Sequence, residues 1–380
     1  MLITITNTSK ISSFCTLDRH FLKLFLVFFI FLFNNAKAAI DLEKMEQDFL
    51  LETKQIHVPG FPEAFNPSII KWTHPLKGDI YLMSFRDFNL VDKTSRIGLL
   101  WLDNNFNPIE QPHFINTRTK NPSIPSRSED ARLFVLNKEL YLIFNDNIKP
   151  KKKRPRKMFI SKLFFDGVKF IAGNIENLFY DSGDPKRKEK NWVPFVYNNK
   201  LLLSYSLLPH KVLIVNPLKN KKYYPIANTV GSNQWNWGEL RGGTPGLLIN
   251  EKEYLAFFHS SKIVCTTQSE NYPLLHYFMG AYTFSSQSPF EITRISPYPI
   301  VDKEYYHDQL YKKINKHVIF PGGFVFDENF IWVIYGKDDE QVWISKFDKE
   351  KLLQSLIPFC NPNPTSMKVL EISLVFSSPK

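Results

Sequence analysis

The feature that most constrains the fold is a hairpin pattern that occurs five times along the chain. Each copy has an apolar, β-rich run, a turn of Asn, Asp, Glu, Lys or Gly, and a second apolar run that ends in polar residues. The copies are IIKWTHPLKGDIYLMSFRD from Ile69, LFVLNKELYLIFND from Leu133, FVYNNKLLLSYS from Phe195, GLLINEKEYLAFFHS from Gly246 and FVFDENFIWVIYGKD from Phe324. A repeat of small sheets with a period of several tens of residues is typical of a β-propeller. We therefore predict an all-β fold, a five-bladed β-propeller.

The chain after residue 38 is predicted to form a single domain, residues 39–380. It is long and 43% apolar, so it can bury a large core, and no Gly/Ser-rich linker interrupts it. Propellers routinely exceed the usual domain length of about 150 residues. The β-like run Val369–Phe376 is expected to complete the first blade and so close the ring.

The first 38 residues are predicted to be a secretory signal peptide. Basic residues precede the apolar run Phe21–Phe33, and Ala36 and Ala38 form a small-residue cleavage site. The run is shorter than the ~20 residues of a standard membrane span. We expect a secreted or periplasmic protein, with an uncleaved N-terminal membrane anchor as the alternative. Cys265 and Cys360 remain after cleavage, either as a disulfide, which an oxidising compartment permits, or as two buried thiols.

The net charge of +11 is concentrated in loops, above all in the run Lys149–Lys157 (KPKKKRPRK). Such a run is typical of nuclear import or nucleic-acid binding, but the predicted export argues against both, so no nucleic-acid partner is expected. The run is either a solvated insertion or a contact with an anionic surface or glycan. The cysteines and histidines lack the spacing of a zinc site, so no metal is expected.

Polar and small residues gather just before each hairpin, where a buried strand would carry Val or Ile. The segments are Asn66-Pro67-Ser68, Glu129-Asp130-Ala131-Arg132, Lys190-Asn191-Trp192, Arg241-Gly242-Gly243-Thr244-Pro245 and Pro321-Gly322-Gly323. In a propeller these positions line the mouth of the central funnel. A carboxylate beside a guanidinium group suits the binding of sugar hydroxyls and the tuning of acidity. From the residues alone, the favoured interpretation of Asp130 beside Arg132 is an ion pair that fixes a blade turn.

Six short motifs follow one another in a fixed order between Phe65 and Leu353. They are Ala64–Ser68 with Ser84–Arg86, Ser128–Leu133, Glu189–Trp192, Gly242–Pro245 with Phe258–His259, Gly280–Tyr282 with Ser296–Ile300, and Phe320–Gly323 with Tyr335–Asp339. The motifs and their order resemble those of glycoside hydrolase family 130, the inverting β-mannoside phosphorylases and hydrolases. The resemblance implies a five-bladed propeller that acts on a carbohydrate substrate, β-mannosides or related glycans, by an inverting mechanism.

The resemblance also implies a role for each motif residue. Asp130 is the expected catalytic proton donor to the glycosidic oxygen, with the 3-hydroxyl of the sugar as relay. The expected substrate-binding residues are Asn66, Arg86, Asn191 and Asp338. The expected phosphate-binding residues are Arg132, Lys190 and His259. An inverting displacement needs one acid and a nucleophile on the opposite sugar face, and an anionic phosphate held by cations can replace a base. We therefore expect no cofactor, with inorganic phosphate or a sugar 1-phosphate as co-substrate.

Departures from the family pattern leave the reaction type open. Ala131 replaces the usual proline, and Phe258-His259-Ser260 replaces Tyr-His-Gly. We favour phosphorolysis or mannosyl transfer, the latter because related propellers resemble mannosyltransferases. Hydrolysis would require a second carboxylate, for which Glu239 and Asp308 are candidates. The alternative is a catalytically silent glycan-binding propeller, or a surface interaction protein that uses the basic loops.

Overall fold

The computed structural model describes residues 39–91, 94–117, 127–146, 156–181, 187–215, 223–231, 235–306 and 316–359. Several predicted features lie outside these ranges: the signal peptide, the run Val369–Phe376, most of the basic run 149–157, Asp308 and Cys360. Within the ranges, no helix is long and apolar enough to cross a membrane.

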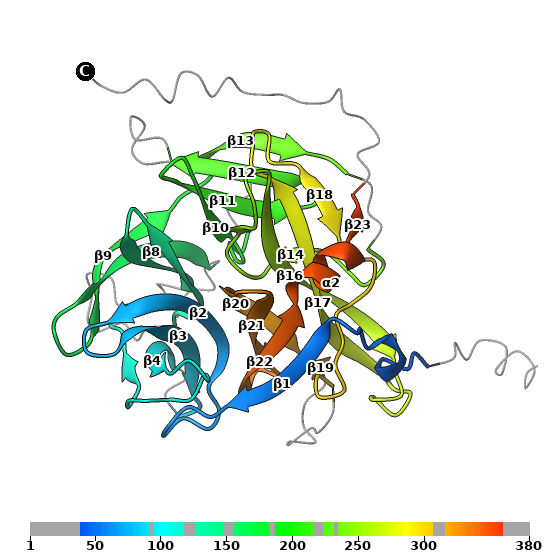
Figure 1. Cartoon of the computed structure of the whole chain (residues 1–380), viewed down its shortest axis with the longest axis horizontal. Helices are drawn as coiled ribbons and strands as arrows, with labels where there is room; N and C mark the ends of the chain where they lie inside the picture. The colour runs from blue at the N-terminus through cyan, green and yellow to red at the C-terminus, as the bar shows by residue number, and fades with distance from the viewer. Residues whose placement is uncertain are drawn as a thin grey trace, which may run out of the picture.

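Four of the sheets are four-stranded and antiparallel, and each contains one predicted hairpin (Figure 1). The first is β2 (Phe65–His74), β3 (Gly78–Asn89), β4 (Thr94–Leu102) and β5 (His113–Phe114). The second is β6 (Glu129–Leu136), β7 (Glu139–Asp146), β8 (Lys157–Phe165) and β9 (Phe170–Leu178). The third is β10 (Val193–Tyr197), β11 (Lys200–Leu207), β12 (His210–Val215) and β13 (Tyr223–Thr229). The last is β20 (Ile319–Asp327), β21 (Phe330–Lys337), β22 (Gln341–Asp348) and the N-terminal strand β1 (Leu50–Ile56).

The remaining sheet departs from the prediction of five like blades, because four regular blades are found. It has seven strands: β14 (Arg241–Gly242), β15 (Leu247–Leu248), β16 (Glu253–Cys265), β17 (Pro273–Ser285), β18 (Ile292–Ile295), β19 (Lys316–His317) and β23 (Ile357–Pro358). Its inner position is split in two around Thr244-Pro245. The Thr244 hydroxyl accepts the Phe257 amide at 2.9 Å, and Pro245 has no N–H to offer a ladder, so one continuous inner strand does not form.

The inner strands form a ring, which gives the molecule its propeller arrangement. Strand β2 lies against β6 and β20, β6 lies against β10, β11 against β14, and β16 against β20. Among the described residues, the short helix α2 (Lys349–Ser355) directly follows β22 of the last sheet, whereas η1 (Glu43–Met45) lies near the turn between β16 and β17, where Gln268 donates to Glu43 Oε1 at 3.4 Å. Strand β1 completes the last sheet by pairing with β22, from Leu50 opposite Phe347 to Ile56 opposite Val342. The expected pairing of Val369–Phe376 with the first blade lies outside the described residues.

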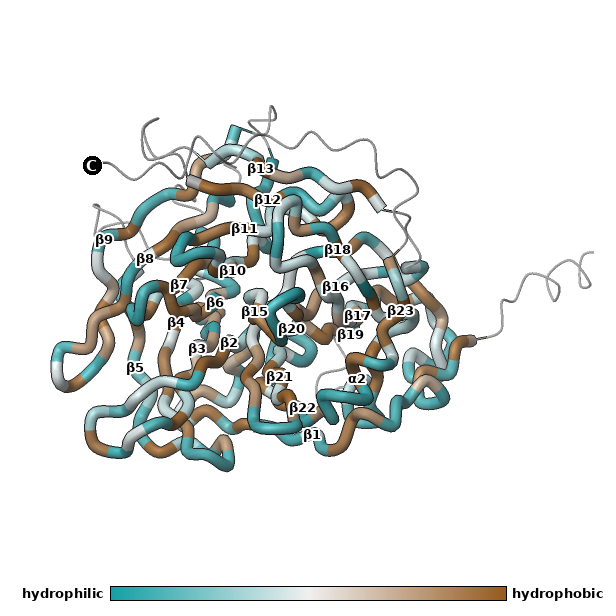
Figure 2. The backbone as a smooth tube through the Cα atoms, turned by 45° about the horizontal axis from the view of Figure 1, so that its top comes forward, coloured by the Kyte–Doolittle hydropathy of each residue, from teal (hydrophilic) through white to brown (hydrophobic). Residues whose placement is uncertain are grey.

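The core lies between neighbouring sheets, and apolar and hydrophilic stretches alternate along the chain (Figure 2). Both faces of a blade strand are buried, as β3 demonstrates. Ile80 and Leu82 pack toward the second sheet, whereas Tyr81 and Met83 pack toward the last sheet. Because successive side chains of a strand point to opposite faces, this explains why the hairpins are continuously apolar rather than alternating. The polar ends of the inner strands are therefore held rigidly around one axis.

Candidate active site

The polar residues that open the blades adopt a backbone conformation that few residue types tolerate. Asn66, Asp130, Asn191 and Asp338 have φ of 46°, 54°, 60° and 56°. In β2 and β6 the left-handed residue sits in a bulge, with the register shifting between Phe65 and Ser68 and between Glu129 and Arg132. Asn and Asp visit this region more readily than other side-chain-bearing residues, and a bulge re-aims the side chain beside it. The backbone thus selects short polar side chains at the funnel and points them away from the ladder.

Asp130 is the centre of a hydrogen-bonded group drawn from two blades. Asn66 Nδ2 donates to its Oδ1 at 2.9 Å, and Arg86 Nη1 donates to the same oxygen at 3.3 Å. Asn145 Nδ2 donates to Oδ2 at 3.4 Å. Asp130 itself is 6% exposed. The first and second blades therefore both hold this carboxylate, and the sequence prediction that Asn66, Arg86 and Asp130 meet is realised in the geometry.

Glu129, which the sequence analysis gave no role, gathers three cations next to Asp130. Arg86 Nη2 donates to its Oε1 at 2.7 Å, Lys190 Nζ donates to its Oε2 at 3.2 Å, and Arg156 Nη2 also pairs with Oε1. The side chains of Arg86, Arg156 and Lys190 are 15%, 24% and 34% exposed, while Glu129 is buried. The buried Glu129 carboxylate therefore holds the three cations in place, while each cation stays partly exposed to solvent.

Arg156 is a residue that the sequence reasoning missed. It belongs to the basic run 149–157, which composition alone presents as a solvated insertion or surface patch. Arg156 instead immediately precedes β8 and pairs with Glu129. Its position one residue before a blade strand was the available signal. We refer below to Asn66, Arg86, Glu129, Asp130, Arg132, Asn145, Arg156 and Lys190 as the Asp130 cluster.

Arg132 is fully buried and ties the second sheet to the seven-stranded sheet. Its Nε donates to the Gly243 carbonyl at 2.6 Å, and its Nη1 donates to the Asp130 carbonyl at 2.6 Å. Its guanidinium lies over the Phe320 ring at 5.4 Å. Burial lowers the pKa of Arg132 to about 10 against the opposing charge of Asp130, so the group stays positive at neutral pH. Its Nη2 is buried without a hydrogen-bond partner among the described residues.

The charges around Asp130 decide its protonation state. Burial alone would raise the pKa of its carboxyl, but the positive charges of Arg86, Lys190 and Arg132 and the bond from Asn66 outweigh burial. They hold the pKa of Asp130 well below its usual range. In the absence of a ligand this group is therefore a carboxylate at neutral pH, since opposite charges nearby favour the ionised form.

His259 lies beside the cluster as a neutral ring. It is buried, with the Phe320 ring 4.6 Å and the Tyr277 ring 6.0 Å from its own. Burial, reinforced by Arg132 and Arg241, lowers the pKa of His259 to about 3. An uncharged imidazole cannot contribute a positive charge to phosphate binding at neutral pH. It can still offer a hydrogen bond, and its Nδ1 has no partner among the described residues.

Asp338 and Asn191 do not join the hydrogen bonds of the Asp130 cluster. Asp338 Oδ1 accepts the Val318 amide at 2.8 Å, which fixes the chain entering β20. The Asn191 carbonyl lies 2.4 Å from where a Cβ on Gly242 would stand. Gly242 is therefore required for the close approach of the third sheet to β14. Both predicted substrate-binding residues have backbone roles here.

The candidate base for hydrolysis is poorly placed. Glu239 has a side chain that is 77% exposed, and it pairs with Arg241 at 3.0 Å. The other candidate, Asp308, lies outside the described residues. Across the described ranges, no group of three or more His, Cys, Asp or Glu residues is arranged to hold a metal ion.

Comparison with solved structures shows that this chain shares its fold with several proteins of known structure. It matches a β-1,2-mannobiose phosphorylase from Listeria innocua at TM-score 0.53 and 14% identity, over 84% of this chain and 97% of that one. It matches a mannose phosphorylase from Leishmania mexicana in complex with a phosphate ion at TM-score 0.52 and 12% identity, over 84% and 95%. A structure from the GH130 family of mannoside phosphorylases, which contains hydrolases that target β-1,2 mannosidic linkages in Candida mannan, matches at 0.53 and 13%, over 76% and 85%.

No protein-family model matches the chain, and no curated protein matches it by sequence. At such low identity the structural matches establish the fold. The resemblance to glycoside hydrolase family 130 that the ordered motifs indicated is therefore confirmed in the architecture, and it extends over most of the chain.

Proposed function

We propose that this protein is a carbohydrate-active enzyme that cleaves or forms β-mannosidic or related bonds by an inverting mechanism, with phosphate or a sugar 1-phosphate as co-substrate. The observation that carries the proposal is the Asp130 cluster. It combines one candidate acid, amide groups suited to sugar hydroxyls, and cations that reach solvent. Solved propellers of this fold include a β-1,2-mannobiose phosphorylase and a phosphate-bound mannose phosphorylase.

The charge of the cluster supports an anionic co-substrate. Within the Asp130 cluster, the four cations Arg86, Arg132, Arg156 and Lys190 face the two carboxylates Glu129 and Asp130, which leaves a surplus of two positive charges in the cluster. A phosphate group carries a charge of about −1.5 to −2 at neutral pH and three strong acceptor oxygens. Such a dianion matches the surplus. Arg132 Nη2 and Asn66 Oδ1, both buried without a partner among the described residues, supply a donor and an acceptor for ligand groups.

The same charges connect anion binding to acid catalysis. A dianion beside Arg86, Lys190 and Arg132 offsets the positive charge that now holds the pKa of Asp130 down, so the pKa of Asp130 rises when the anion is bound. In phosphorolysis a phosphate oxygen bonds to C1 of the mannosyl unit as the bond from C1 to the leaving oxygen breaks. The leaving oxygen takes the proton from Asp130, directly or through a sugar hydroxyl, and Asp130 is reprotonated from solvent. The products are mannose 1-phosphate and the shortened sugar.

One observation favours a second candidate function. The ionised Asp130 of the unliganded protein is a good acceptor for sugar hydroxyls and a poor acid. A catalytically silent glycan-binding propeller would use this state directly. Hydrolysis is the least supported reaction, because Glu239 is exposed and paired with Arg241.

The test is to incubate the protein with mannose 1-phosphate and small mannoside acceptors, and with β-mannobiose in the presence and absence of phosphate. We expect turnover that depends on phosphate or on the sugar 1-phosphate. Asp130→Asn keeps the left-handed backbone and the size of the side chain, and it should lower kcat about 10²–10⁴-fold. Full activity of D130N would refute the acid role, and mannoside binding without any turnover would select the glycan-binding function.

Two further features belong to this proposal. The seven-stranded sheet occupies the place of an irregular fifth blade, because its strands β14 and β16 lie between the third and last sheets.

Residues 1–38 act as the signal for export, so that the enzyme meets extracytoplasmic glycans. An intact-mass measurement of the mature protein that begins at residue 39 would support export, whereas a mass beginning at Met1 would contradict cleavage.

A further inference from the structure

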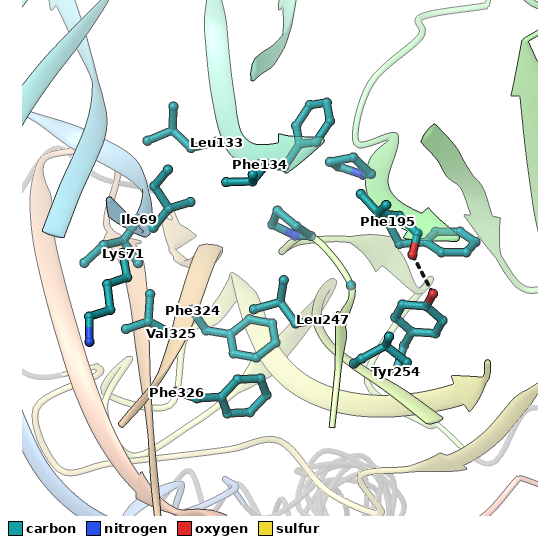
Figure 3. A pocket seen from close by; sticks show the side chains of 17 residues that line it. Ile69, Lys71, Leu133, Phe134, Phe195, Leu247, Tyr254, Phe324, Val325 and Phe326 are labelled. Atoms are coloured by element: carbon teal, nitrogen blue, oxygen red, sulfur yellow. Dashed lines mark hydrogen bonds between the residues drawn. The ribbon is translucent and has the colours of Figure 1, made fainter. Parts of the chain in front are cut away.

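An apolar pocket, called here the far-mouth pocket, lies between the inner strands of the five sheets (Figure 3). Its volume is about 460 Å³, and all five sheets contribute to it through β2, β6, β10, β15 and β20 with their adjoining residues. Phe134, Phe195, Leu247, Phe324 and Phe326 point into or around it. The volume lies within the ~300–1,000 Å³ of small-molecule sites, which are concave and lined mainly by hydrophobic and aromatic side chains.

This pocket is separate from the Asp130 cluster. The cluster lies where the inner strands begin, and the pocket lies toward their other ends, beyond Ile69 in β2 and Leu133 in β6. Between the two, β2 and β20 approach so closely that Gly322 and Gly323 have no room for a Cβ. A Cβ on Gly322 would lie 1.9 Å from the Pro67 carbonyl oxygen, and one on Gly323 would lie 2.5 Å from the Ile69 nitrogen. In the same region, the bond from Arg132 Nε to the Gly243 carbonyl also joins the second sheet to the seven-stranded sheet. A ligand in the pocket therefore does not occupy the sugar site.

The polar groups of the pocket are few, and they indicate the type of ligand. Tyr254 lines it, but its hydroxyl is already donated to the Val196 carbonyl at 2.6 Å. Lys71 is the single charged residue among the lining residues, it is exposed, and it has no ion pair or hydrogen bond with any described residue. An apolar cavity with one free cation at its edge complements a hydrocarbon group that ends in an anion.

Two rim residues show that the pocket opens to solvent. Leu248 is 52% exposed and Val135 is 38% exposed, although both line it. Apolar surface that stays in water costs about 25 cal/mol per Å² relative to burial. A ligand that covers these rim side chains gains this free energy, while its charged end stays hydrated beside Lys71.

We propose that this far-mouth pocket, lined by the ends of the inner strands and edged by Lys71, binds a single-chain amphiphile with an anionic head, of the fatty-acid type. The hydrocarbon chain lies among the phenylalanine rings and the carboxylate faces Lys71. The proposal is independent of the reaction proposed for the Asp130 cluster.

The experiment measures binding of dodecanoate, well below its micellar concentration, to the intact protein by calorimetry, with thermal unfolding as a second readout. We expect saturable one-site binding and a rise in Tm with ligand concentration. Val135→Trp fills the pocket from its exposed rim and should abolish binding while the fold is kept. Lys71→Glu should weaken binding by up to about fivefold, the upper size of one exposed ion pair. Lys77→Glu, an exposed lysine on the adjoining turn that does not line the pocket, is the matched charge control and should leave binding unchanged.

Three outcomes would overturn the proposal. Absence of saturable binding, or binding that V135W leaves intact, removes the site. Equal affinity for dodecanoate and neutral dodecanol, with K71E indistinguishable from K77E, removes the anionic head and leaves a pocket for neutral apolar molecules. Tighter binding of dodecyltrimethylammonium than of dodecanoate to the unmodified protein contradicts the role of Lys71.

Discussion

Replacing Arg132 with methionine separates the structural role of this residue from its charge. The guanidinium is fully buried and bonds the carbonyls of Gly243 and Asp130, each at 2.6 Å. Methionine fills most of the volume but donates no hydrogen bond, so two buried carbonyls lose their partner. Each such loss costs about 1–3 kcal/mol. Relief from burying a charge offsets part of this cost. We expect the free energy of unfolding to fall by about 3 kcal/mol.

Lys190→Met is the matched comparison, because it also removes one cation from the Asp130 cluster. Lys190 is 34% exposed and pairs with Glu129 at 3.2 Å, so its loss should cost at most about 1 kcal/mol of stability. Both variants should raise the phosphate concentration needed for half-maximal activity, by about tenfold or more, since a bond between charged groups contributes about 1.5–3 kcal/mol.

The assay is urea unfolding followed by tryptophan fluorescence, together with initial rates at varied phosphate. Because the denaturant slope reports the surface exposed on unfolding, it should stay the same in the three proteins. If R132M unfolds within 1 kcal/mol of the unmodified protein, the two carbonyl bonds do not stabilise the fold as argued here. If phosphate dependence is unchanged in both variants, the cations do not bind the co-substrate.

Two further predictions concern the scaffold. Burial lowers the pKa of His210 to about 4, and the bond from its ring to the Phe290 carbonyl opposes this shift. The unfolded chain takes up a proton near the ordinary histidine pKa of about 6.5, so the stabilisation should be complete above that pH and should decrease as the pH falls to about 4. In urea unfolding at a series of pH values, His210→Gln should reduce this dependence. Gly322→Ala places a Cβ 1.9 Å from the Pro67 carbonyl oxygen, so it should destabilise the ring by several kcal/mol or prevent folding. The control is Gly60→Ala, whose Cβ meets no atom within 4 Å and which should cost only the ~1–2 kcal/mol of a left-handed backbone. Equal effects in the two variants would contradict the close packing of β2 and β20.

The propeller and the placement of Asn66 and Asp130 at blade entries could be predicted from local pattern, whereas a place for Arg86 in the same site was implied only by the family resemblance. Each blade repeats its hairpin, and polar residues at strand entries mark bulges where the backbone is left-handed. A ring then brings these entries together. This prediction needs only the equivalence of the blades and no knowledge of distances between residues.

Other features depend on contacts between distant segments. Arg156 lies in a run whose composition indicates solvent exposure, and its pairing with Glu129 is seen only in the structure. The binding roles expected of Asp338 and His259 stay predictions, but the sequence does not show the contacts that these two side chains make in the fold. Asp338 is engaged with the Val318 amide, and burial removes the positive charge of His259. The split inner strand of the seven-stranded sheet follows from the Thr244 hydroxyl bond together with the missing N–H of Pro245, and hydrophobic periodicity does not reveal it.

The pairing of β1 with β22 has a consequence for how the chain is made. Thr53 and Ser345 share a hydrogen bond across 292 residues of sequence, so a ribosome delivers one partner long before the other. Until β22 has been synthesised, β1 lacks its partner strand in the last sheet. The sheets made earlier then form an open arc with unpaired edges. Late, long-range pairing of this kind is slow and leaves the nascent chain prone to aggregation. We therefore expect yield during expression to depend on chaperones more strongly than the stability of the finished ring would suggest.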